Sequence, residues 1–154
     1  MPKTIFLAGI MQGSHKGTAL HQQDYRCDLT SHLSNAFPDA KIYDPFADHQ
    51  DSVAYDLQTG REVFFRHNQM CRKVDLLVAY VPEASMGTAI EIWEAYRHHQ
   101  FVVTISPLRH NWTVCHCSHL CYPTWQSFSN GLTSGEIARE YAAYRQQQSD
   151  SSPL

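Results

Sequence analysis

The 154-residue sequence contains no apolar run of the length that a membrane-spanning helix needs, which is about 18 residues or more. Its N-terminal apolar stretch is too short for the hydrophobic part of a secretion signal, and no small-residue cleavage site follows it. These two absences predict a cytoplasmic protein that has no membrane partner.

The sequence also lacks an excess of positive charge, because 12 Lys and Arg residues stand against 15 Asp and Glu residues, for a net charge of −3. Proteins that bind duplex nucleic acid obtain their affinity mainly by neutralising phosphates. The charge balance therefore argues against a duplex nucleic-acid partner. It is compatible with a small nucleotide ligand, which needs no basic surface.

Five cysteines occur in a chain that has no export signal, and an odd number of this kind indicates free thiols rather than a disulfide framework. A chain of this length, with 43% hydrophobic residues, can bury a full core without disulfides or a structural metal. We expect one domain over residues 1–145 and a flexible tail over 146–154.

Short apolar stretches without polar alternation are typical of strands buried on both faces of a parallel sheet. They predict strands at residues 3–8, 41–43, 75–81 and 101–105, with 113–122 as a candidate last strand. Helices are predicted at 19–36, at 61–73, from Ser85 onward and at 133–147, and a long loop at 44–60. The alternation predicts an α/β fold, a three-layer α/β/α sandwich around a doubly wound parallel sheet of Rossmann or flavodoxin type.

In an open parallel sheet, ligands bind beyond the carboxyl ends of the strands. The first strand is followed by GIMQGS, in which Gly9 and Gly13 allow close approach of the backbone to a ligand, beside Gln12 and Ser14. The loop lacks both the GxGxxG spacing of dinucleotide sites and the terminal GK[ST] of phosphate loops. It is therefore a candidate binding loop of no standard type, or simply a tight turn between strand and helix.

A second loop leads into the helix that is predicted to begin at Ser85. Ser85 can cap this helix, Gly87 offers a first-turn amide to a ligand, and Glu91 lies in the second turn on the side of the helix mouth. The alternative for Glu91 is a solvated glutamate, like Glu94 beside it. The face that we expect against the sheet consists of Ala89, Ile92, Trp93 and Tyr96.

The segment VDLLVAYVPEASMGTAIEIWEAY, together with IFLAGIMQGS, resembles the nucleoside 2-deoxyribosyltransferase family and its nucleoside 5′-monophosphate N-glycosidase relatives. The resemblance covers about residues 3–106, and the S-x-G-x-x-x-E spacing from Ser85 to Glu91 is its most specific part. It implies a five-stranded parallel sheet, cleavage of the N-glycosidic bond of a nucleoside or nucleotide, no cofactor, and a homodimer or higher homo-oligomer.

The resemblance also implies roles for individual residues. Glu91 matches the nucleophile that attacks the anomeric carbon, where a carboxylate stabilises or captures an oxocarbenium-like transition state. Transferases of the family tend to carry an aspartate at the position of Ser85, and the monophosphate hydrolases a serine. Ser85 therefore favours hydrolysis of a nucleotide, with base exchange by a transferase as the alternative.

Some positions depart from the family pattern. His67 stands where relatives usually have an aspartate, and a histidine can donate a proton to the departing base near neutral pH. Asp44 and Asp56, from the predicted long loop, are candidate replacements for the missing carboxylate.

The first strand and loop depart as well. Ile10 and Gln12 replace the serine and arginine that phosphate-specific relatives use, which leaves His15 or Lys16 as candidate phosphate ligands. Phe6 replaces a common tyrosine and can stack on a base but cannot form a hydrogen bond.

Near the C-terminal end, Asn111 or His110 is a candidate to complete the active site of a neighbouring subunit, as residues of this stretch do in the family, with an exposed turn as the alternative. The segment CHCSHLC at 115–121 has ligand types that zinc prefers, but its spacing does not suit the common zinc sites. We therefore predict no metal site, and a buried thiol face against the last helix. The remaining alternative for the whole chain is a nucleotide-binding protein without catalytic activity.

Overall fold

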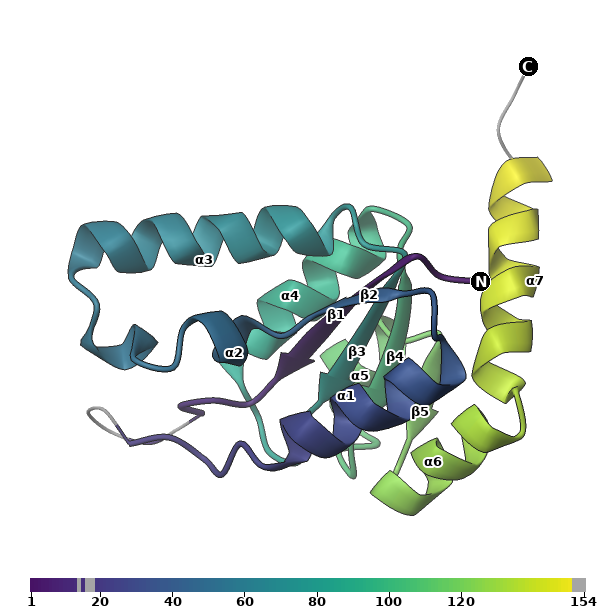
Figure 1. The fold of residues 1–154 in the computed structure, drawn as a ribbon, viewed down its shortest axis with the longest axis horizontal. Helices are drawn as coiled ribbons and strands as arrows, with labels where there is room; N and C mark the ends of the chain where they lie inside the picture. Colours follow the sequence, from purple (N-terminus) through teal and green to yellow (C-terminus); the bar gives the residue numbers. More distant parts are fainter. Residues whose placement is uncertain (14, 16–18, 151–154) are drawn as a thin grey trace.

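The protein is described by a computed structural model over residues 1–13, 15 and 19–150 (Figure 1). Two residues that the sequence predicts as ligand contacts, Ser14 and Lys16, lie outside the described residues. Within the described part of the chain, no helix combines the length and the apolar character that a membrane crossing requires.

Five parallel strands form one sheet with the order β2-β1-β3-β4-β5. The strands are β1 (Thr4–Gly9), β2 (Lys41–Tyr43), β3 (Leu76–Tyr80), β4 (Phe101–Ile105) and β5 (Leu120–Tyr122). Strand order reverses beside β1, since β2 lies on one side of it and the later strands lie on the other. The predicted α/β fold is confirmed, and the strand predicted over 113–122 is confined to its last residues.

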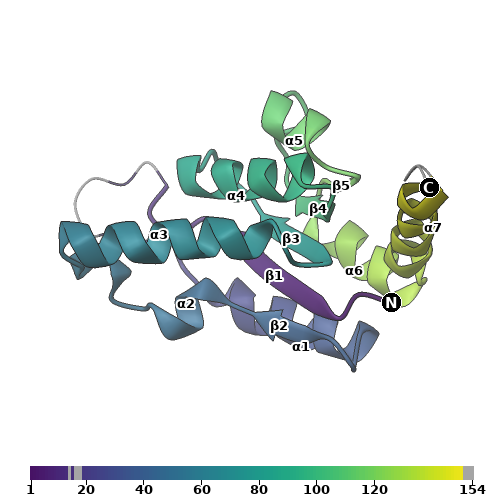
Figure 2. The same cartoon turned by 90° about the horizontal axis from the view of Figure 1, so that it is seen from above.

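Helices cover both faces of the sheet, as Figure 2 shows. On one face lie α1 (Tyr25–Ala36), α6 (Trp125–Thr133) and α7 (Glu136–Asp150), and on the other lie α3 (Leu57–Cys71), α4 (Met86–Arg97) and α5 (Trp112–His116). Successive residues of β1 point to opposite faces, so Leu7 joins the first core and Phe6 the second. Both side chains are fully buried, which explains the unbroken apolar sequence of the strand.

The helix expected over 19–36 begins only at Tyr25, because the residues before it are tied to the first loop. The backbone N–H of His21 donates to the carbonyl of Met11 over 2.7 Å, and the Gln23 side chain donates to the carbonyls of Ile10 and His21 over 3.1 and 2.8 Å. These hydrogen bonds hold residues 21–23 against the first loop in a conformation that is not helical.

The prediction of a long loop is also wrong for the segment 44–60. It contains the short helix α2 (Pro45–Asp48), a single 3₁₀ turn at Ser52–Ala54 and the first residues of α3. The side chains of Asp44 and Asp56 cap α2 and α3, each by accepting a hydrogen bond from a first-turn amide. These two aspartates thus act as helix caps.

Helix α4 begins after Ser85, as predicted, but its sheet-facing side differs from the expected one. Trp93 and Tyr96 are 50% and 38% exposed, whereas Thr88, Ile92 and Ala95 are buried. Glu94, expected in solvent, is 9% exposed and accepts a hydrogen bond from Arg72 over 2.7 Å. The buried side of α4 therefore differs from the predicted one and shares Ile92 with it.

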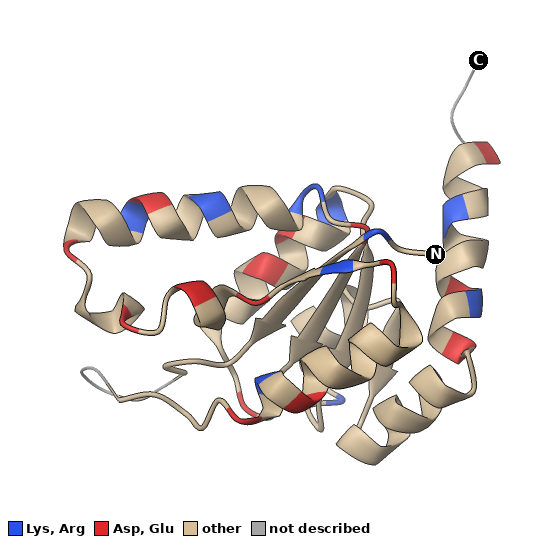
Figure 3. Ribbon diagram, viewed as in Figure 1, with Lys and Arg blue, Asp and Glu red and all other residues tan. Residues whose placement is uncertain are grey.

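The C-terminal part differs most from the predictions. Residues 112–116 are helical, and α6 was not predicted. Helix α7 continues to Asp150, so residues 146–150 of the predicted tail are helical, and its residues 151–154 lie outside the described residues. Cys117 is buried while Cys115 and Cys121 are exposed, so the predicted thiol face does not form. No group of metal-ligating side chains large enough to hold an ion occurs among the described residues. The Lys and Arg side chains of the described residues are scattered over several helices and strands (Figure 3).

Candidate active site

The carboxyl ends of β1 and β3 meet where the strand order reverses, with Gly9 paired to Tyr80. Beyond them lies a cavity of about 300 Å³, named here the central cavity, between the first loop and the N-terminal turns of α4. Its lining includes predicted site residues from both loops, namely Gly9, Gln12, Gly13, Ser85, Gly87 and Glu91. The structure thus brings together two loops that are far apart in the sequence, at the edge where α/β folds bind ligands.

A second cavity, of about 180 Å³, opens between α3 and α4 and is named here the helix cavity. His67 and Asn68 line it from α3, and Gly87 and Glu91 line it from α4. Gly87 and Glu91 also line the central cavity, so the two spaces meet at these residues. Glu91 can therefore contact a ligand that extends from one cavity into the other.

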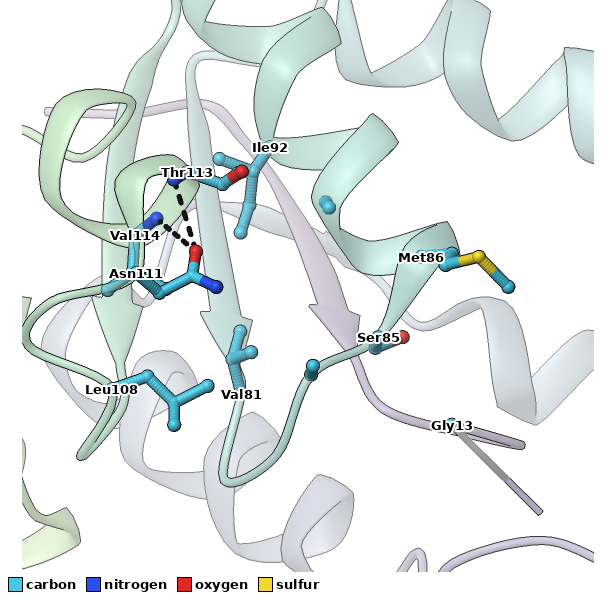
Figure 4. A pocket seen from close by; sticks show the side chains of 11 residues that line it. Gly13, Val81, Ser85, Met86, Ile92, Leu108, Asn111, Thr113 and Val114 are labelled. Carbon is cyan, nitrogen blue, oxygen red and sulfur yellow. Dashed lines mark hydrogen bonds between the residues drawn. The ribbon is translucent and has the colours of Figure 1, made fainter.

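A third cavity, of about 380 Å³, shares Gly13, Ser85 and Met86 with the central cavity and has mostly apolar walls (Figure 4). Asn111 lines it within the same chain, rather than only from a neighbouring subunit. The Asn111 side-chain oxygen is already engaged, since it accepts hydrogen bonds from the amides of Thr113 and Val114 at the start of α5 over 3.1 and 3.3 Å.

The structure explains the two glycines at the first loop by packing and backbone conformation, whereas the sequence analysis explained them by close approach of a ligand. A side chain at Gly9 would collide with the hydroxyl of Tyr25, which donates to the carbonyl of Ile10 over 3.2 Å. Gly13 has a φ of +56°, a conformation that favours glycine. These two glycines shape the loop, whereas a Cβ on Gly87 would enter open space at the cavity wall.

Ser85 is the N-cap of α4. Its Oγ accepts from the Thr88 amide over 3.4 Å and lies 2.9 Å from the Thr88 hydroxyl. This cap fixes the first turn of α4 at the wall of the central cavity. It leaves the N–H groups of Met86 and Gly87 directed toward the mouth of the helix. A ligand oxygen placed there can accept from them.

The Glu91 carboxyl lies at the junction of the cavities, where protein surrounds it apart from a surface that faces the ligand space. Burial raises the pKa of Glu91 to about 8, and the Arg26 guanidinium opposes the shift. A carboxyl group that lines a cavity and has a pKa close to neutral pH is typical of a catalytic group rather than of a surface glutamate.

Arg26 is the main residue near the site that the sequence did not indicate. Only 3% of it is exposed, and it donates to the carbonyl of Gly9 over 3.2 Å and to the Asp44 carboxylate over 2.7 Å. Buried arginines are rare and carry no local pattern. Its position on the core side of α1 was the available signal, one turn before the buried Leu29 and two turns before the buried Leu33.

His67 is buried, with Nε2 lying 3.1 Å from the Tyr43 hydroxyl. Burial, His49 and Arg66 together lower the pKa of His67 to about 4. The ring is therefore neutral near pH 7 and offers hydrogen bonds but no positive charge, which differs from the expected proton donor.

Asp44 and Asp56 lie away from Glu91. Asp44 is bound to Arg26 and to the amide of Phe46, and Asp56 is exposed at the start of α3, where the Thr59 amide donates to it over 2.8 Å and lowers its pKa. Neither aspartate lines the central cavity or the helix cavity. The structure therefore does not bring either aspartate into the cavities that Glu91 lines.

No protein-family model matches the sequence, and no curated protein is similar to it in sequence. Solved structures are similar to it in fold. A 2-deoxyribosyltransferase from the psychrotolerant bacterium Bacillus psychrosaccharolyticus matches with a TM-score of 0.62 at 17% identity, covering 82% of this chain and 90% of that protein.

Two further structures match over nearly their whole length. The CMP N-glycosidase BcmB of Clostridium botulinum has a TM-score of 0.53 at 19% identity, covering 86% of this chain and 99% of that one. A conserved protein from Enterococcus faecalis V583 has a TM-score of 0.53 at 17% identity, covering 93% and 99%. The chain therefore has the nucleoside 2-deoxyribosyltransferase fold, as the resemblance implied.

Proposed function

We propose that the protein is an enzyme that hydrolyses the N-glycosidic bond of a nucleoside or nucleoside 5′-monophosphate, with Glu91 as the nucleophile. The main support is the place of Glu91, which lines both the central cavity and the helix cavity. A substrate that spans the junction puts its sugar in the central cavity and its base between α3 and α4, with the glycosidic bond beside the carboxylate. The fold shared with a 2-deoxyribosyltransferase and a CMP N-glycosidase agrees with this chemistry.

The reaction proceeds in two displacements. The ionised Glu91 carboxylate forms a bond to the anomeric carbon while the carbon–nitrogen bond breaks, and the electron pair leaves with the base, which takes a proton from water. Water then attacks the anomeric carbon of the glycosyl ester, the bond to Glu91 breaks, and the carboxylate is regenerated with release of a proton. A second base in place of this water gives base exchange.

The surroundings of Glu91 support these steps. The N-terminal amides of α4 and the Ser85 hydroxyl lie on the sugar side, where they can bind oxygens of the sugar or its phosphate. The neutral His67 and its neighbours lie on the base side. Ser85 favours hydrolysis over exchange, because the family resemblance implies an aspartate at this position in transferases and a serine in the monophosphate hydrolases.

The test is base release from a panel of ribo- and deoxyribonucleosides and their 5′-monophosphates, followed by chromatography. We expect free base and sugar or sugar phosphate from at least one of them, and none from Glu91→Ala. The matched control is Glu83→Gln, because Glu83 is exposed in the loop before α4 and should be dispensable. Products with an exchanged base, formed when a second base is added, would identify a transferase. Tight binding without any release would identify a non-catalytic nucleotide-binding protein.

We also propose a homodimer or higher homo-oligomer of a cytoplasmic enzyme, in which Asn111 binds the substrate from the third cavity, which shares Ser85 with the central cavity. Light scattering of the purified protein measures the oligomeric state. A monomer at assay concentration that still releases base would mean that each active site is complete within one chain, as the position of Asn111 near Ser85 allows.

A further inference from the structure

Asn68 lines the helix cavity, and its side chain carries a buried hydrogen-bond acceptor that has no partner in the described part of the chain. The residue is 4% exposed, and its side-chain oxygen is buried without a partner in the described part of the chain. Its side-chain nitrogen donates to the Phe64 carbonyl one turn earlier over 2.9 Å. A carbonyl can only accept, so this bond holds the nitrogen toward Phe64 and leaves the oxygen as the unpaired atom.

A buried acceptor of this kind is costly. Leaving it without a donor destabilises a protein by about 1–3 kcal/mol, and unpaired buried groups are therefore uncommon. At a cavity wall the missing donor can come from a ligand. Asn68 lies on the same wall as His67, and the helices α3 and α4 run side by side across this cavity (Figure 2).

The helix cavity suits a flat heterocycle. Its walls combine apolar side chains from Pro45, Val63 and Phe64 with polar ones. At about 180 Å³ it is smaller than the usual pockets for whole drug-sized ligands, which measure about 300–1,000 Å³, so it fits a base rather than a complete nucleoside.

We propose that Asn68 determines base specificity by accepting a hydrogen bond from an N–H group on the departing nucleobase, so that the preferred substrates carry such a donor on the edge away from the sugar. This inference rests on the proposed function, because it places the base between α3 and α4. It assigns to Asn68 a binding role that is separate from the chemistry at Glu91.

The first experiment compares substrates that differ only in this donor. Adenosine carries an amino group that purine riboside lacks, and cytidine carries one that pyrimidin-2-one riboside lacks. For whichever ring size the enzyme accepts, we expect kcat/KM to be about 10–100-fold higher for the member that has the donor. In Asn68→Leu, which has similar volume and no acceptor, we expect the ratio to fall to within about threefold.

The control is Phe64→Leu, which alters the same cavity without touching a polar side chain. It should lower kcat/KM for both members of a pair to a similar extent and keep their ratio. Circular dichroism and thermal unfolding establish whether Asn68→Leu is folded. If it is not, Asn68→Ala provides the same comparison with a shorter side chain that also has no acceptor.

A binding measurement separates this inference from the proposed function. Calorimetry with Glu91→Gln compares adenine with purine, or cytosine with pyrimidin-2-one, in the presence and absence of Asn68→Leu. Donor preference that disappears with Asn68→Leu supports the inference even if no substrate turns over. Base release by the wild type with unchanged discrimination in Asn68→Leu would overturn it while the proposed function stands.

Discussion

The guanidinium of Arg26 lies 2.7 Å from the carboxylate of Asp44 and connects the first strand to the start of α2. Arg26 also donates to the carbonyls of Leu7 and Gly9 over 3.4 and 3.2 Å, and Asp44 accepts from the Phe46 amide over 3.0 Å. This buried pair fixes the first loop and the segment leading to α3, and its cation is the one that opposes the pKa shift of Glu91.

We therefore expect Asp44→Ala to destabilise the protein by about 3 kcal/mol, because it leaves a buried guanidinium without a counter-charge. Urea unfolding followed by circular dichroism measures this difference. Asp39→Ala, which removes an exposed aspartate in the turn before β2, is the control and should change stability by less than about 0.5 kcal/mol. Equal stability of the two variants would contradict a structural role for the pair.

The pKa of Glu91 predicts how the reaction depends on pH. As the proposed nucleophile Glu91 reacts in its carboxylate form, and with a pKa of about 8 the fraction of carboxylate rises with pH. We expect kcat/KM to increase about tenfold for each pH unit below pH 8 and to level off above it. Initial rates of base release between pH 5.5 and 9.5 measure this profile. A profile that is flat from pH 6 to 9 would contradict the assignment.

The same pKa shift has a consequence for stability. Between about pH 4.3 and 8 the folded protein holds a proton on Glu91 that the unfolded chain has released, so wild-type stability falls as pH rises through this window. Glu91→Gln removes the titration. We expect its Tm to exceed that of the wild type by about 5 °C at pH 9 and by less than about 2 °C at pH 5. A difference that is constant with pH, in thermal unfolding scans, would count against the raised pKa.

His67 should remain neutral through the working range of the enzyme. Because burial and two neighbouring groups that can be positive lower its pKa to about 4, its ring signals in NMR spectra should not titrate between pH 5.5 and 8. His67→Gln keeps a neutral hydrogen-bonding side chain, so we expect it to retain kcat/KM within about tenfold, while His67→Leu loses more. A titration midpoint near pH 6.5 would instead support the proton-donor role expected from the sequence.

Gly87 offers a direct test of where the ligand lies. An added Cβ meets no protein atom within 4 Å, and alanine is favoured over glycine in a helix by about 1 kcal/mol. Gly87→Ala should thus fold with equal or higher Tm, yet lower kcat/KM about tenfold or more by occupying ligand space. Gly9→Ala, which collides with Tyr25, should instead lose stability. Full activity in Gly87→Ala would place the ligand elsewhere.

The sequence predicted best what depends on short patterns. The strand at Phe101–Ile105 is apolar except for Thr104, and the start of α4 follows from the capping serine at 85, so both were predicted to the residue. The start of α3 was missed because a capping aspartate looks the same as a loop aspartate until its bond to Thr59 is known.

Other features could not be read from the sequence for physical reasons. The periodicity of apolar residues indicates an amphipathic helix, but it does not decide which of two adjacent stripes of side chains packs against the sheet. Trp93 is therefore predicted to be buried, whereas in the structure it is 50% exposed. The roles of Arg26 and Asn68 depend on burial and on partners distant in the chain, which no local pattern encodes. Glu91 was indicated by its spacing from Ser85, while its position between two cavities required the fold.

The wall that α3 contributes to the helix cavity is a single stripe of residues, formed by Gly60, Val63, Phe64, His67 and Asn68. Because these positions lie on a regular helix rather than on a loop, substitutions there alter the shape and polarity of the wall without redirecting the backbone. A combinatorial library confined to this stripe is thus a compact route to enzymes with new base preferences, with Glu91 and the sugar side left intact.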